Sequence, residues 1–113
     1  MIARAVDILR SRGFENIRAD IGELEKPSRI TQKDSGVEYT PDLTALFGDG
    51  QCYFEIVGKS KKNKNRLISK WSLLSMIARM RRGSFFVMTP QGKLNYAQKL
   101  IKENNIQAEI IRM

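Results

Sequence analysis

Residues 37–57, VEYTPDLTALFGDGQCYFEIV, predict two extended segments joined by a tight turn. Residues 37–47 are mostly apolar and carry a proline that fixes the backbone before the second half of the segment. Residues 48–50, Gly-Asp-Gly, have the composition of a turn, and residues 51–57 predict a second strand. A turn this short makes the two strands antiparallel partners, so the stretch predicts a β-hairpin.

Helical and extended patterns alternate on both sides of this hairpin. Upstream, apolar residues at helical spacing predict a helix over 2–12, followed by a strand over 16–22 and an irregular connection over 23–36. Downstream, the pattern predicts a helix from Leu67 through Arg82, a strand over 84–89, a helix over 91–104 and a strand over 106–111. Strands that are linked through helices run parallel, whereas the hairpin is antiparallel. The expected fold is α/β, a mixed β-sheet flanked by helices, in a single domain over residues 1–113.

Composition excludes several classes of chemistry. The chain has one cysteine, Cys52, and no histidine, which rules out an internal disulfide framework, cysteine-based or histidine-based zinc sites and histidine-dependent nucleophilic catalysis. No apolar run reaches the roughly 18 residues of a membrane-spanning helix. A free thiol without a targeting segment favours a cytoplasmic protein, or one in the host cytoplasm if a phage encodes it. An enzyme made from this chain has to use carboxylates, lysines, hydroxyls or oxygen-bound metals.

Charge is divided unequally along the chain. Residues 1–55 hold seven basic and ten acidic residues, a net charge of −3, and residues 56–113 hold thirteen basic and two acidic ones, a net charge of +11. No Asp or Glu occurs from Ile56 to Lys102. A block of one sign repels itself unless an anion lies against it, which favours a nucleic-acid partner. The alternative interpretation is a solvated basic face.

Two carboxylates flank the hairpin. Asp42 opens the first strand and Glu55 lies late in the second, so pairing brings both to the same end of the sheet. A divalent cation neutralises two adjacent carboxylates, and oxygen ligands suit Mg²⁺ or Mn²⁺. Residues 55, 57 and 59 share a strand face, which places Lys59 on the side of Glu55. These groups suit phosphodiester hydrolysis. In the alternative interpretation Asp42 caps a turn, Glu55 pairs with a lysine and Lys59 is a surface residue.

The pattern resembles the PD-(D/E)XK nuclease superfamily. Pro41-Asp42, an apolar hairpin and Glu55 followed by lysines are similar to its motif, and Arg12-Gly13-Phe14 with Arg18 resembles small Holliday-junction-resolvase-like and phage-type members. The resemblance implies an αβββαβ restriction-endonuclease-like core, extended here by a helix and a strand. It also implies a metal-dependent DNA endonuclease, in which Asp42, Glu55 and the backbone carbonyl of Ile56 hold Mg²⁺ or Mn²⁺.

Two positions depart from that pattern. The lysine expected two residues after the acid is replaced by Val57, so we predict Lys59 as the catalytic lysine, with Lys70 on the following helix as the alternative. Resolvase-like members carry a glutamate in the first helix, where this chain offers only Asp7. These departures leave two further hypotheses open, a non-catalytic nucleic-acid-binding module with the nuclease fold and an assembly protein that binds an acidic partner.

A basic segment follows the hairpin and predicts contacts to phosphates. A domain of this size can also pair as a homodimer to span two strands. The predicted nucleic-acid-binding residues are Lys61, Lys62, Lys64, Arg66 and Lys70.

Overall fold

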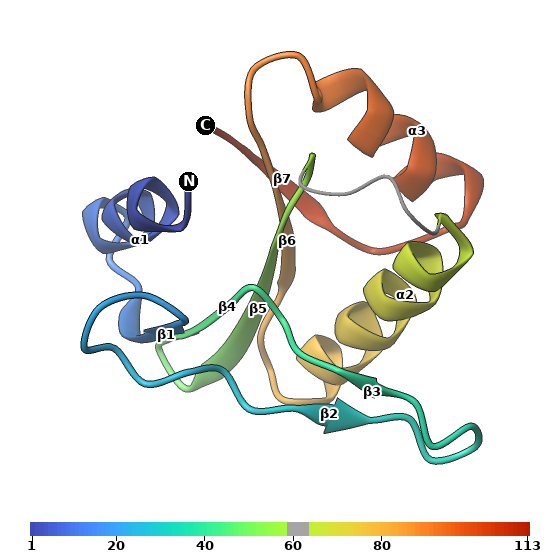
Figure 1. The fold of residues 1–113 in the computed structure, drawn as a ribbon, viewed down its shortest axis with the longest axis horizontal. Helices are drawn as coiled ribbons and strands as arrows, with labels where there is room; N and C mark the ends of the chain where they lie inside the picture. Colours follow the sequence, from blue (N-terminus) through green and yellow to red (C-terminus); the bar gives the residue numbers. More distant parts are fainter. Residues whose placement is uncertain (59–63) are drawn as a thin grey trace.

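The predicted hairpin forms the middle of a mixed sheet in the computed structural model, which describes residues 1–58 and 64–113 (Figure 1). Within those residues the sheet has five strands in the order β1-β4-β5-β6-β7, and β2 and β3 form a separate two-stranded ribbon. The elements are α1 (Ile2–Ser11), β1 (Glu15–Ala19), β2 (Ile30–Thr31), β3 (Glu38–Tyr39), β4 (Leu43–Phe47), β5 (Gly50–Ile56), α2 (Lys64–Met80), β6 (Phe85–Thr89), α3 (Leu94–Glu103) and β7 (Glu109–Arg112).

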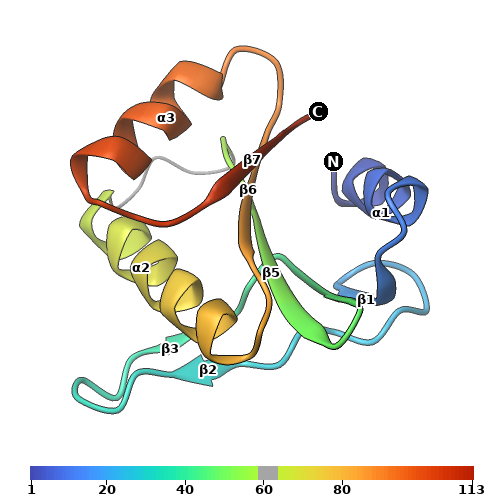
Figure 2. The ribbon, with the colours of Figure 1, turned by 180° about the vertical axis from the view of Figure 1, so that it is seen from behind.

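Strand directions follow from the connections. β1, β4 and β5 pair antiparallel, and β5, β6 and β7 pair parallel because α2 and α3 carry the chain back across the sheet. Both crossover helices lie on one face of the sheet and α1 lies on the other, as the two opposite views show (Figures 1 and 2). The prediction of an α/β fold with a mixed sheet flanked by helices is confirmed.

Alternation along β5 divides the core into two layers. Cys52, Phe54 and Ile56 pack with α1, whereas Tyr53 and Val57 pack with α2 and α3. Glu55 lies between Tyr53 and Val57 in this second set, so a buried carboxylate faces the side of the sheet that α2 and α3 cover. The alternation therefore decides which helices can supply partners to Glu55.

The hairpin turn is one residue shorter than expected. Phe47 pairs with Gly50, which leaves Gly48 and Asp49 as the turn. Gly48 has φ 61° and Asp49 has no positive φ, which fits a type II′ turn with glycine first. This turn fixes the register of β4 against β5, and with it the pairing of the residues at the far end.

Two predictions for residues 23–47 are wrong in detail. The segment expected to be an irregular connection contains β2, because Ile30 pairs with Tyr39 and Thr31 with Glu38. The extended segment expected over 37–47 is divided into β3 and β4 at Pro41, which lacks the N–H that a ladder needs. The break separates the ribbon from the main sheet and sets Asp42 immediately before β4.

In the part of the chain that the structure describes, no helix is long and apolar enough to cross a membrane.

Candidate active site

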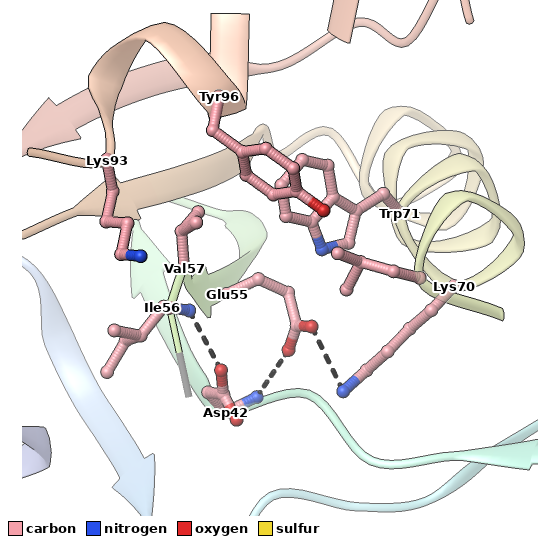
Figure 3. Close-up of a pocket in the computed structure, with 10 residues that line it drawn as sticks. Asp42, Glu55, Ile56, Val57, Lys70, Trp71, Lys93 and Tyr96 are labelled. Atoms are coloured by element: carbon pink, nitrogen blue, oxygen red, sulfur yellow. Dashed lines mark hydrogen bonds and ion pairs between the residues drawn. The ribbon is translucent and has the colours of Figure 1, made fainter. Parts of the chain in front are cut away.

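The register of β4 and β5 brings the two predicted carboxylates together. Leu43 pairs with Phe54, so Asp42 and Glu55 occupy the next position of the ladder. The Asp42 N–H donates to Glu55 Oε2 at 2.9 Å, and the Ile56 N–H donates to Asp42 Oδ2 at 2.8 Å (Figure 3). Each carboxylate thus accepts a backbone hydrogen bond from the opposite strand. This reciprocal pairing holds both side chains in place before any ligand binds.

Lys70 completes the cluster from α2. Its Nζ lies 3.0 Å from Glu55 Oε1, and the side chains of Lys70 and Glu55 are 19% and 4% exposed. α2 crosses the face of the sheet toward which Glu55 points, which is why a helix residue fifteen positions later can reach it. The two charges lose much of their solvation in this position, so removal of either side chain leaves the other as an unpaired, poorly solvated charge.

The surroundings of Glu55 destabilise its ionised form. Its pKa is raised to about 7, first by burial and then by the negative charge of Asp42, while the charge and hydrogen bond of Lys70 and the Asp42 N–H partly offset the rise. Glu55 therefore holds its negative charge only marginally near neutral pH. A cation beside the two carboxylates relieves both the burial cost and the repulsion.

A pocket of about 190 Å³ opens directly beside the carboxylates. Its wall includes Trp71 and Tyr96, and Figure 3 shows Lys93 approaching from the start of α3 while Lys70 approaches from α2. The indole nitrogen of Trp71 is buried and has no hydrogen-bond partner among the described residues. Trp71 thus leaves a donor unsatisfied at the pocket wall. The lining residues are Asp42, Glu55, Ile56, Val57, Gly58, Leu67, Lys70, Trp71, Lys93 and Tyr96.

Gly58 allows Lys93 to pass close over the end of β5. A Cβ atom at Gly58 would lie 3.2 Å from Cε of Lys93, and the φ of Gly58 is 112°, a region that favours glycine. The backbone therefore leaves β5 in a conformation that keeps space for the Lys93 stem beside the carboxylates.

The predicted catalytic residues have different outcomes. Asp42, Glu55 and the alternative lysine, Lys70, are brought together, whereas Lys59 lies outside the described residues. Asp7 is exposed on α1, whose buried residues face the opposite layer, and it does not line the pocket. The structure therefore does not bring Asp7, the acid that the first helix offers, into this cluster.

The predicted nucleic-acid contacts are only partly described. Lys61 and Lys62 lie outside the described residues, and Lys64 is exposed at the first residue of α2. Arg66 lies over the ring of Tyr39, 4.7 Å from its centroid, and donates to the Glu38 carbonyl at 3.1 Å, so it also holds the ribbon against α2.

The donor set fits a hard divalent cation. Among residues 1–58 and 64–113 no group of three or more Asp, Glu, Cys or His side chains is placed to hold a metal ion. Mg²⁺, however, commonly binds through one or two carboxylates and takes its other ligands from water and substrate phosphates. Asp42 and Glu55 meet that requirement, and the destabilised charge of Glu55 is what a cation offsets.

Lys93 and Tyr96 were missed by the sequence-based prediction. Both follow β6, which runs parallel to β5, and the loops after parallel strands meet at one edge of the sheet. The Thr-Pro-Gln-Gly segment before Lys93 was therefore the available signal, since it marks the end of a buried strand beside the strand of Glu55.

The chain has no significant match to a protein-family model, a curated protein or a solved structure. Its function is accordingly inferred from the geometry and charge of the site.

Proposed function

We propose that this protein is a metal-dependent nuclease that hydrolyses phosphodiester bonds in DNA. The observation that carries the proposal is the buried cluster of Asp42, Glu55 and Lys70 at the mouth of a pocket. The order α1-β1-β4-β5-α2-β6, with an antiparallel meander followed by a parallel strand, supports a restriction-endonuclease-like core of the PD-(D/E)XK type. In that assignment α3 and β7 extend the core.

Each residue of the cluster has a distinct role in the proposed reaction. Asp42 and Glu55 hold a Mg²⁺ or Mn²⁺ ion, with the Ile56 backbone carbonyl as the further ligand that the superfamily resemblance implies. An ion held there would supply positive charge against the phosphate and would lower the pKa of a water molecule. Lys70 favours the ionised form of Glu55 through their 3.0 Å contact and places its own charge beside the phosphate. Lys93 adds a second ammonium group to the same pocket.

Lys70 takes the role for which Lys59 was the first sequence-based choice. Val57 occupies the usual lysine position, and its side chain packs with α2 and α3 on the face that Glu55 shares. Lys70 reaches the same region from α2 and is only 19% exposed. A lysine supplied by the helix therefore compensates for the valine in the strand.

The charge of the chain supports a polyanionic substrate. Residues 56–113 carry the net charge of +11, and they include both lysines of the pocket. Basic residues without neighbouring acids attract phosphates and make binding depend on salt.

A non-catalytic nucleic-acid-binding module is the second candidate. It is favoured by the internal pairing of the cluster, in which Glu55 Oε1 already binds Lys70 and Glu55 Oε2 already accepts the Asp42 N–H. Such a cluster can join two strands and a helix in a purely structural role. Cleavage distinguishes the two candidates.

Cleavage of supercoiled, linear, branched and single-stranded DNA in Mg²⁺ or Mn²⁺ tests the proposal. We expect metal-dependent cleavage by the wild type and its loss in Asp42→Asn and Glu55→Gln. Lys70→Met is expected to reduce the rate by about 100-fold or more, in the range of one lost electrostatic group. Asp49→Asn is the matched control, because Asp49 is an exposed hairpin residue that pairs with Arg82. Wild-type protein that binds all four DNA forms and cuts none with either metal would establish the binding module instead.

A further inference from the structure

A second polar pocket lies on the same face of the sheet as Glu55. Its volume is about 270 Å³. We name it the arginine pocket, because three of its lining residues are arginines and none is Asp or Glu. The lining residues are Arg18, Ser28, Arg29, Ile30, Thr44, Gln51, Tyr53 and Arg81.

The three arginines come from separate parts of the chain. Arg18 lies in β1, Arg29 precedes β2, and Arg81 follows the last residue of α2. β2 lies below the carboxyl end of α2 in both views, which brings the last two together (Figures 1 and 2). Three arginines that line one pocket give it positive charge, which an anion in the pocket offsets.

Existing contacts leave this positive charge largely uncompensated. Arg18 pairs with Glu25 at 3.5 Å and Arg29 with Glu38 at 3.8 Å, but these carboxylates are 78% and 53% exposed and neither lines the pocket. Exposed pairs of this kind contribute little free energy. Tyr53, which lines the pocket together with Arg81, has a pKa raised by burial and is therefore neutral, so it adds no negative charge.

The floor of the pocket provides neutral polar groups. Thr44 and Tyr53 are 6% and 4% exposed, and they form a cross-strand pair. Three arginines and these two hydroxyl side chains, which line one pocket, suit a phosphate, whose oxygens accept several hydrogen bonds at once. The chemistry of the pocket therefore matches an oxyanion of phosphate size.

The arginine pocket is one ladder repeat away from the proposed catalytic carboxylates. Tyr53 precedes Glu55 by two residues on β5 and Thr44 follows Asp42 by two residues on β4, so both pairs lie on one face. Two residues of a strand span about 7 Å. A nucleic-acid strand rises about 3.4 Å per nucleotide, so this spacing corresponds to a step of one or two nucleotides.

We infer that the arginine pocket binds a backbone phosphate of the nucleic acid near the bond that is cut. This inference rests on the proposed function, because it takes the substrate to be a polynucleotide that passes the carboxylates. Arg18, Arg29 and Arg81 fix the position of the strand, and the Asp42 and Glu55 cluster acts on a neighbouring phosphodiester.

Salt-dependent binding of a 20-nucleotide DNA duplex and a single strand, with the cleavage-deficient Asp42→Asn protein, tests the inference. Adding Arg81→Gln or Arg29→Gln is expected to reduce the slope of log affinity against log salt by about one, since one phosphate contact is lost. Arg81→Lys retains the charge and is expected to restore most of the slope. Arg82→Gln is the matched control, because Arg82 is 79% exposed, pairs with Asp49 and does not line the pocket.

The result separates this inference from the proposed function. If Arg81→Gln and Arg29→Gln both keep the slope of the Arg82→Gln control while the wild type cuts DNA, the arginine pocket is not a phosphate site and the nuclease assignment stands. If both variants lose slope and the wild type never cuts DNA, the phosphate site stands and the nuclease assignment fails. Arg29 is 72% exposed in a connecting segment, so its replacement tests the inference even if Arg81→Gln does not fold.

Discussion

Replacing Glu55 by glutamine is expected to remove a loss of stability that the metal-free wild type shows as the pH rises. Glu55 is 4% exposed in its side chain, and its pKa is raised from 4.5 to about 7, chiefly by burial. The folded protein therefore holds a proton on Glu55 more tightly than the unfolded chain does. The stability that comes from protonated Glu55 is complete below about pH 4.5 and is lost as the pH rises to about 7 and above. Glutamine is neutral throughout and loses nothing over this range.

The size of the effect follows from the two pKa values. A change from 4.5 to about 7 corresponds to about 3 kcal/mol at 1.36 kcal/mol for each pH unit. The unfolding free energy of Glu55→Gln minus that of the wild type is expected to increase by about this amount between pH 4.5 and 8. The contributions of titrating groups that do not interact with Glu55 cancel in the difference, because both proteins contain them unchanged.

Urea denaturation in EDTA at several pH values measures this difference. Trp71 is the one tryptophan of the sequence and is 1% exposed, so its fluorescence reports unfolding. Glu103→Gln is the control, because it replaces an exposed carboxylate by the same amide. A Glu55→Gln difference that stays constant within about 0.5 kcal/mol from pH 4.5 to 8 would refute the reasoning, since burial would then not be acting on the Glu55 charge.

Three other perturbations have defined outcomes. Mg²⁺ at 100 times its dissociation constant is expected to stabilise the wild type by about 2.7 kcal/mol and to stabilise Glu55→Gln much less. Thermal unfolding with and without the ion measures both effects. Thr89→Val is expected to stabilise the fold by about 1 kcal/mol in urea denaturation, because the buried Thr89 hydroxyl has no partner among the described residues. Gly83→Ala is expected to destabilise the fold by more than about 3 kcal/mol, because a Cβ there would lie 1.8 Å from the Gln51 carbonyl oxygen; an unchanged urea midpoint would contradict this close approach.

Local sequence patterns were sufficient to predict the layout of the sheet and the meeting of the two carboxylates. Alternation in β5 and the glycine turn act over neighbouring residues, so they define the hairpin without help from the rest of the chain. Once the hairpin forms, its register brings Asp42 opposite Glu55. The helices between later strands likewise imply parallel pairing, which is why the α/β fold with a mixed sheet was predicted correctly.

Long-range packing decided the remaining parts of the site. The contact of Lys70 with Glu55 depends on the rotation of α2 against the sheet, and the sequence spacing offered Lys70 only as the alternative to Lys59, which lies outside the described residues. Lys93 enters the pocket because β6 lies beside β5, a relation between residues more than thirty positions apart. The arginine pocket depends on the β2–β3 ribbon folding under α2, and a two-residue strand has too weak a local pattern to predict it. Periodicity reports which face of an element is buried, whereas only the packed structure decides which faces meet.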